Sequence, residues 1–111
     1  MAAITFAPPE MLKEGYATEA PVGVELLDTA GSPIEFCKFS LAPGASTIDE
    51  AHEEHEVWFI TGGSGQLTLD GEIIELVEGA AIQLKPHAWH QLVNTGNRSL
   101  NVITFYWGAK I

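Results

Sequence analysis

Apolar and polar residues alternate in short runs along most of this chain, and Gly or Pro interrupts the runs at close intervals. Alternation with a period of two is typical of a strand with one face in a core and the other outside it. The pattern predicts eight strands, at residues 22–28, 34–41, 56–61, 65–70, 72–77, 80–84, 88–94 and 99–107, with a ninth short strand at 45–50 as an option. Residues 1–20 are interpreted as an N-terminal arm, in which 8–13 forms either a short helical turn or extended chain.

Turn-forming residues separate the predicted strands. Asp70-Gly71 is the strongest hairpin signal, because this dipeptide tolerates the positive φ angles of a type I′ turn. Short strands at nearly even spacing indicate an all-β sandwich or closed barrel, and closure removes the edges that would invite aggregation. The length of 111 residues fits one domain, so we expect residues 1–111 to form a single small jelly-roll barrel.

The charge balance limits the partners of the protein. Fifteen Asp and Glu against five Lys and Arg give a net charge of −10, so we expect neither nucleic acid nor membrane as a partner, whereas a cation is favoured. The sequence has no apolar run of membrane-spanning length and no signal-peptide pattern after Met1, which predicts a cytoplasmic protein. The single cysteine, Cys37, alternates with Phe39 and Leu41, and we interpret it as a buried structural thiol.

All four histidines fall in two close pairs, His52 with His55 and His87 with His90. The first pair lies in the run 49–56, where five of the fifteen acidic residues are found. Such a run is either a solvated face or a cation site, since closely spaced carboxylates repel one another unless a cation neutralises them. Imidazole with carboxylate suits Fe(II), Mn(II), Ni(II) or Zn(II). If strand alternation holds here, residues 50, 52 and 56 share one face and His55 points the other way.

Two spaced motifs resemble those of the cupin family, whose fold is a double-stranded β-helix. The first runs from Pro43-Gly44 through Glu50-Ala51-His52 and Glu56 to Gly63, and the second from Gly79 through Pro86 and His90 to Asn94. The resemblance implies a metal site of His52, Glu56 and His90, with Glu50 standing where the family usually has its first His. Two anionic ligands would balance a 2+ ion and favour Fe2+ or Mn2+, with Ni2+ or Zn2+ as alternatives. His55 could replace Glu50, and His87 stands where the family often has Gly.

The resemblance implies a metal-dependent enzyme acting on a small neutral or metal-chelating organic molecule, with a non-heme dioxygenase favoured. An isomerase, epimerase or lyase is one alternative, and non-catalytic binding of a metal or small ligand is another, as is a structural cupin without a metal. Glu50 or His55 could move protons, and Tyr106 could supply a phenol to the cavity. Basic residues are scarce, with Lys38 and Lys85 as the candidates to point inward, which disfavours phosphorylated substrates. By resemblance we also expect a homodimer.

Three further side chains have simpler expectations. Trp58 should share the face of Glu56 and wall the pocket, whereas Trp89 should point away from His90. Asn94 opens a turn and is interpreted as structural rather than as a ligand.

Overall fold

The computed structural model describes residues 6–7, 22–27 and 33–108, and confirms an all-β fold. None of the described residues forms a helix, and therefore none forms a helix that could cross a membrane. The helical candidate at 8–13 and most of the predicted arm lie outside the described residues. The strands are β1 (Phe6–Ala7), β2 (Val22–Leu27), β3 (Ile34–Leu41), β4 (His55–Gly62), β5 (Ser64–Leu69), β6 (Glu72–Val77), β7 (Ala81–Leu84), β8 (His90–Asn94) and β9 (Leu100–Trp107).

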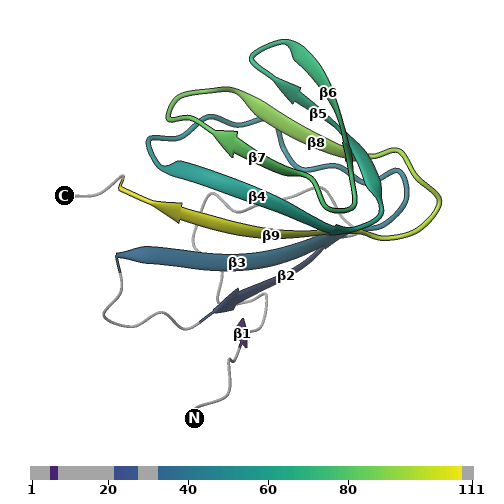
Figure 1. Cartoon of the computed structure of the whole chain (residues 1–111), viewed down its shortest axis with the longest axis horizontal. Coiled ribbons are helices and arrows are strands. Elements are labelled where there is room, and N and C mark those ends of the chain that lie inside the picture. Colours follow the sequence, from purple (N-terminus) through teal and green to yellow (C-terminus); the bar gives the residue numbers. More distant parts are fainter. Residues whose placement is uncertain (1–5, 8–21, 28–32, 109–111) are drawn as a thin grey trace.

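The strands form two facing sheets of a jelly-roll barrel (Figure 1). The larger sheet has the order β1-β2-β3-β9-β4-β7 and the smaller has the order β6-β5-β8, with every neighbouring pair antiparallel. Gly63 links β4 to β5, where the chain passes from one sheet to the other. Its φ of +82° and the closeness of the Ser99 and Leu100 backbone leave no room for a Cβ, so only glycine fits this crossing.

Strand positions agree closely with the sequence pattern. The strands at 34–41 and 72–77 have the predicted bounds, and the others differ by one or two residues at an end. The option of a strand at 45–50 was wrong: this segment meets β8 only through isolated bridges, Ser46 with Val93 and Glu50 with His90. The predicted hairpin is confirmed, because Asp70 and Gly71 both have positive φ between β5 and β6.

The apolar core lies between the two sheets, where the inward-facing side chains of both sheets meet. Cys37 is buried among them at 1% exposure, which confirms its structural interpretation. Each fully buried aliphatic side chain contributes about 1.5–3 kcal/mol to folding relative to an exposed one. The core cluster includes Leu41, Trp58, Ile60, Leu67, Leu76, Leu84, Leu92, Leu100 and Val102.

Asn94 is confirmed as a structural residue. Its buried amide nitrogen donates to the carbonyl oxygens of Leu41 and Arg98, at 2.8 Å each, and its Oδ1 accepts from the Gly96 N–H at 2.9 Å. One side chain therefore fixes the end of β3 and the turn between β8 and β9, because it satisfies three backbone groups at once.

Candidate metal centre

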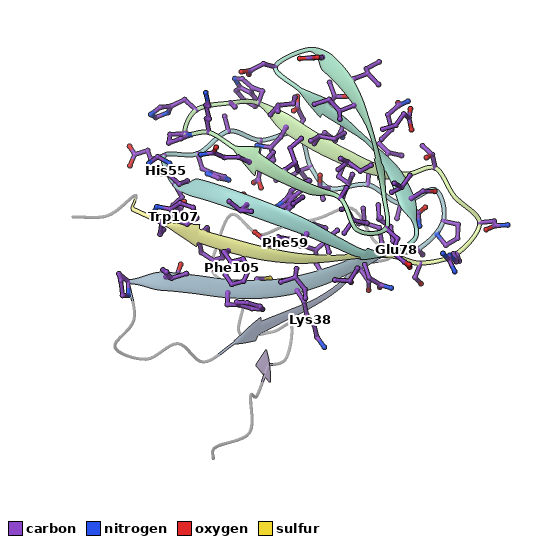
Figure 2. The ribbon with its side chains drawn as sticks, viewed as in Figure 1. Lys38, His55, Phe59, Glu78, Phe105 and Trp107 are labelled. Carbon is purple, nitrogen blue, oxygen red and sulfur yellow. The ribbon has the colours of Figure 1, made fainter. Side chains whose placement is uncertain are left out.

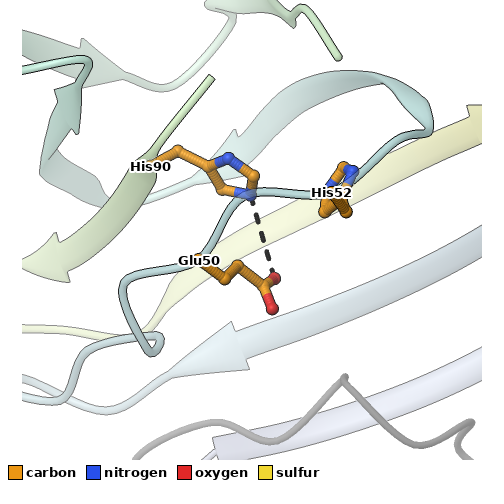
Figure 3. Close-up of side chains that lie close together, drawn as sticks. All are labelled: Glu50, His52 and His90. Carbon is orange, nitrogen blue, oxygen red and sulfur yellow. Dashed lines mark ion pairs between the residues drawn. The ribbon is translucent and has the colours of Figure 1, made fainter. Parts of the chain in front are cut away.

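Backbone hydrogen bonds bring together the two sequence motifs that carry the candidate ligands. Glu50 and His90 form an antiparallel bridge, with N···O distances of 3.1 and 2.9 Å. The His87 N–H donates to the His52 carbonyl at 2.7 Å. Residues 50–52 and 87–90 are therefore joined side by side at the start of β8, and the side chains of Glu50, His52 and His90 lie close together (Figure 3).

Four side chains that the sequence nominated as ligands meet in this region. One ligand atom from each of Glu50, His52 and His90 lies within 4.8 Å of the others (Figure 3). The Nε2 atom of His90 is 3.8 Å from Glu50 Oε1 and 3.8 Å from Glu56 Oε1. The two distances from His90 Nε2 fall within the separation of about 3–4 Å expected for groups that each lie about 2.1 Å from one ion, whereas the Glu50, His52 and His90 cluster as a whole is looser.

His90 has a nitrogen that is ready to bind a metal. Its Nδ1 lies 2.9 Å from the Ala88 carbonyl, which only accepts, so Nδ1 carries the proton and Nε2 presents a lone pair. Among the described residues, His90 Nε2 is the buried side-chain nitrogen or oxygen with no hydrogen-bond partner. Burial lowers the pKa of His90, which keeps this lone pair free. A buried, unprotonated imidazole facing two carboxylates fits a divalent cation.

His52 reaches the cluster through a loop rather than a strand. Its Nδ1 lies 3.2 Å from the Glu54 carbonyl and its Nε2 lies 2.9 Å from Glu56 Oε1. Both partners are acceptors, so both nitrogens donate when no metal is bound, and the hydrogen bond to Glu56 raises the pKa of His52. Residues 51–54 are not in a strand, so the argument from strand alternation that placed His52 on the face of Glu50 and Glu56 was wrong. His52 nevertheless lies in the cluster of candidate ligands.

Glu56 is held by three donors inside the barrel. Oε2 accepts from Trp58 Nε1 at 2.6 Å and from Thr104 Oγ1 at 2.7 Å, while Oε1 faces His52 Nε2. Burial alone would raise the pKa of Glu56, but the hydrogen bonds from His52, Thr104 and Trp58 outweigh it and leave the pKa below its ordinary value. The lowered pKa favours the negatively charged form of Glu56, which is the form that binds a cation.

Glu50 has a different environment from Glu56. Burial raises the pKa of Glu50 to about 7, although the nearby His52 opposes the shift. The side chains of Glu50 and His52 are 28% and 24% exposed, against 7% for Glu56 and 2% for His90. Solvent therefore reaches the cluster from the side of Glu50 and His52, and a ligand would enter there.

The family model for the cupin domain matches residues 37–106, which include both motifs and all four clustered side chains. The chain belongs to the cupin family. An uncharacterized protein of Methanocaldococcus jannaschii is 33% identical over 61 residues, which are 54% of this chain and 49% of that protein. The alignment thus spans about half of that relative's length.

Solved cupin structures have the same fold. A cupin 2 conserved barrel domain protein from Salinispora arenicola superposes with a TM-score of 0.74 and 26% identity, covering 85% of this chain and 82% of that one. A structure described as a predicted oxalate decarboxylase from Thermotoga maritima has a TM-score of 0.72 and 23% identity, covering 78% and 79%. The second likeness shows the fold alone.

Two candidate catalytic residues of this cupin lie on opposite faces of the larger sheet. Tyr106 is buried on the inward face of β9, where it is the register partner of Glu56. His55 lies on the outward face of β4, and its ring stacks on Trp107 with centroids 5.5 Å apart and planes 8° apart (Figure 2). The structure therefore separates His55 from the cluster, and its expected roles as proton carrier and substitute ligand are corrected, because β4 begins at this residue and alternates normally from it.

The expectation that Lys38 and Lys85 point inward was also wrong. Lys38 alternates with buried Cys37 and lies on the outer face of β3, and Lys85 is exposed. Trp89 is 56% exposed and points away from His90, as predicted. His87 is exposed with a φ of +67°, and its contribution to the site is the backbone bond to His52.

Sequence reasoning placed Trp58 near Glu56 but missed its hydrogen bond, and it missed the contact of Thr104. A signal was present: Thr104 stands between Val102 and Tyr106 on the inward face of β9, and a hydroxyl in such a place needs a partner.

Proposed function

We propose that this cupin is a metal-dependent enzyme that acts on a small neutral or metal-chelating organic molecule, with Fe(II) or Mn(II) held by Glu50, His52, Glu56 and His90. The observation that carries the proposal is the buried His90 Nε2, which has no hydrogen-bond partner among the described residues and faces two carboxylates. Such an ion would supply Lewis-acid chemistry and, as Fe(II), reaction with O2, so non-heme dioxygenation is the activity we favour. We place this activity in the cytoplasm.

The charges around the site support the choice of substrate class. Within residues 33–108, Lys38 lies on the outer face of β3, and the side chains of Lys85 and Arg98 are exposed. A phosphorylated substrate would therefore find no buried Arg or Lys among the described residues. A molecule that chelates the ion, or a neutral one, needs none. Oxalate is a chelating dianion, and the description of the Thermotoga structure makes it a useful test compound.

Metal content and O2 uptake test the proposal together. The untagged protein is purified, its metals are measured, and Fe(II)- and Mn(II)-loaded samples are incubated with neutral and chelating organic molecules, oxalate included, while O2 is followed. We expect a bound first-row metal and O2 consumption that depends on Fe(II). Turnover that continues under strict anaerobiosis would replace the dioxygenase with an isomerase, epimerase or lyase. Tight ligand binding without turnover would indicate a binding protein, and the absence of bound metal after loading would refute the site.

We propose further that the partner of this chain is a second copy, docked on the outer face of the larger sheet. This outer face carries a groove of about 330 Å³ lined by Ile34, Val57, Phe59, Phe105 and Trp107, and Ile34 and Phe59 are exposed. Figure 2 labels Phe59, Phe105 and Trp107 on β4 and β9. The outward positions of β3, β4 and β9 contain no Asp or Glu in a chain that has fifteen. Two such faces can meet without carboxylate repulsion, whereas most of the remaining surface of this acidic chain cannot.

The dimensions of the outer face suit a dimer. β3, β9 and β4 are about 26 Å long, and the shorter β2 and β7 about 20 and 13 Å. At about 4.8 Å per strand these five neighbours give on the order of 500 Å² per copy, at the low end for a specific interface. Light scattering should give the mass of a dimer for the wild type and a monomer for Phe59→Lys. Ile73→Lys, which alters an even more exposed apolar residue on β6, should stay dimeric. A monomeric wild type would refute this interface.

A further inference from the structure

The two oxygens of the Glu56 carboxylate have different surroundings. Oε2 already accepts two hydrogen bonds, from Trp58 Nε1 at 2.6 Å and Thr104 Oγ1 at 2.7 Å. Oε1 instead faces the two imidazoles, 2.9 Å from His52 Nε2 and 3.8 Å from His90 Nε2. The donors on Oε2 fill the lone-pair directions that a second metal contact would need.

We infer that Trp58 and Thr104 are positioning residues that hold Glu56 as a single-oxygen ligand and aim Oε1 at the ion. The inference rests on the proposed metal site, and adds to it which atom binds and what orients that atom. Neither donor touches the ion or a substrate; both act through the carboxylate. Outer hydrogen bonds of this kind fix the direction and basicity of a ligand in metal sites generally.

The fold makes this arrangement rigid. Trp58 lies two residues after Glu56 on the same face of β4, and Thr104 is the register partner of Trp58 in β9. Both are buried, at 2% and 1% exposure. The two donors thus come from one cross-strand pair, and neither can move without disturbing the β4–β9 ladder.

Trp58 also connects Glu56 to the ligand from the second motif. Its indole meets the His90 ring edge to face, with centroids 5.8 Å apart, and meets Phe39 on another side at 5.6 Å. Glu50, by contrast, shows no hydrogen bond to a described side chain and is partly exposed. One side of the site, made by Glu56 and His90, is therefore fixed by packing, whereas Glu50 can adjust to an incoming ligand.

Substitutions that remove a donor while keeping shape test the inference. Thr104→Val deletes the hydroxyl, Thr104→Ser restores it, and Trp58→Phe removes the N–H while keeping an aromatic ring beside His90. Thr61→Val and Trp89→Phe are matched controls, because both side chains are exposed and Thr61 Oγ1 donates to the Asn101 backbone carbonyl rather than to a side chain. Titration of the full-length protein with Mn(II) gives the affinity, and the visible spectrum of Co(II) reports the ligand geometry.

We expect Thr104→Val and Trp58→Phe each to weaken Mn(II) binding by about tenfold or more and to change the Co(II) spectrum, with circular dichroism unchanged. Thr104→Ser should recover most of the affinity, and both controls should match the wild type. In a Glu56→Ala background, Thr104→Val should have no further effect, because its only route to the ion is gone.

The outcomes separate the inference from the metal site itself. A folded Thr104→Val or Trp58→Phe protein with wild-type affinity and spectrum would overturn the positioning role while leaving the site intact. A further loss in the Glu56→Ala background would overturn it as well, since the donor would then act by another route. A wild type that binds neither Mn(II) nor Co(II) would instead remove the proposed function.

Discussion

Removing the metal should lower the stability of the wild-type protein and have a much smaller effect on a His90→Ala variant. An ion that binds only the folded state adds about 2.7 kcal/mol to the free energy of unfolding when its concentration is a hundred times its Kd. For 111 residues, the entropy of unfolding is about 0.23 kcal/mol/K near the midpoint, so the melting temperature should rise by about 12 °C. The assay is a thermal melt of the EDTA-treated protein with and without Mn(II).

The shift in melting temperature expected for His90→Ala depends on His90 Nε2, which lies 3.8 Å from a carboxylate oxygen of Glu50 and 3.8 Å from one of Glu56. If the loss of this nitrogen weakens binding by about a hundredfold, the same Mn(II) concentration adds about 0.4 kcal/mol, a shift of about 2 °C. His55→Ala is the matched control, because this histidine stacks on Trp107 on the outer face and should keep the full shift. An undiminished shift in His90→Ala, or a lost shift in His55→Ala, would show that the ligands are misassigned.

Three other predictions concern stability. Without metal, Glu50→Gln should match the wild type near pH 4 and melt higher at pH 8: the pKa of Glu50 is about 7 when folded against 4.5 as the reference, so its charged form costs stability as the pH rises between these values. Asn94→Ala should lower the free energy of unfolding in urea by about 3 kcal/mol, since this buried side chain loses three hydrogen bonds, whereas Asn97→Ala, at an exposed position, should change little. Gly65→Ala should cost about 2 kcal/mol or more in the same assay, because its Cβ would lie 2.7 Å from a backbone oxygen, and Gly71→Asn, in open space at positive φ, should cost far less.

Each of these has a result that contradicts it. If the difference in melting temperature between Glu50→Gln and the wild type does not grow with pH, the Glu50 carboxylate is well solvated. An Asn94 variant as stable as the Asn97 variant would mean that water replaces the lost bonds. A Gly65→Ala variant as stable as the wild type would show that β5 and β8 separate easily at Gly65.

The sequence alone predicted the strands and nominated the candidate ligands. Alternation in segments such as 34–41 and 72–77 depends only on which side chains prefer water, and it predicted those bounds correctly. The paired histidines and the acidic run nominated Glu50, His52, Glu56 and His90 because carboxylate and imidazole are chemically suited to a cation wherever they lie. The spacing that resembles the cupin motifs also predicted that the segments 43–63 and 79–94 contribute to one site.

Only the tertiary structure decided how those groups face one another. His52 enters the site from a loop, where the period of two has no meaning, and His55 lies on the far side of β4. The bridge between Glu50 and His90, and the hydrogen bond from Thr104 to Glu56 across 48 residues, are contacts between distant segments. A local pattern cannot encode such contacts, because they depend on sheet pairing and register that the whole chain settles at once.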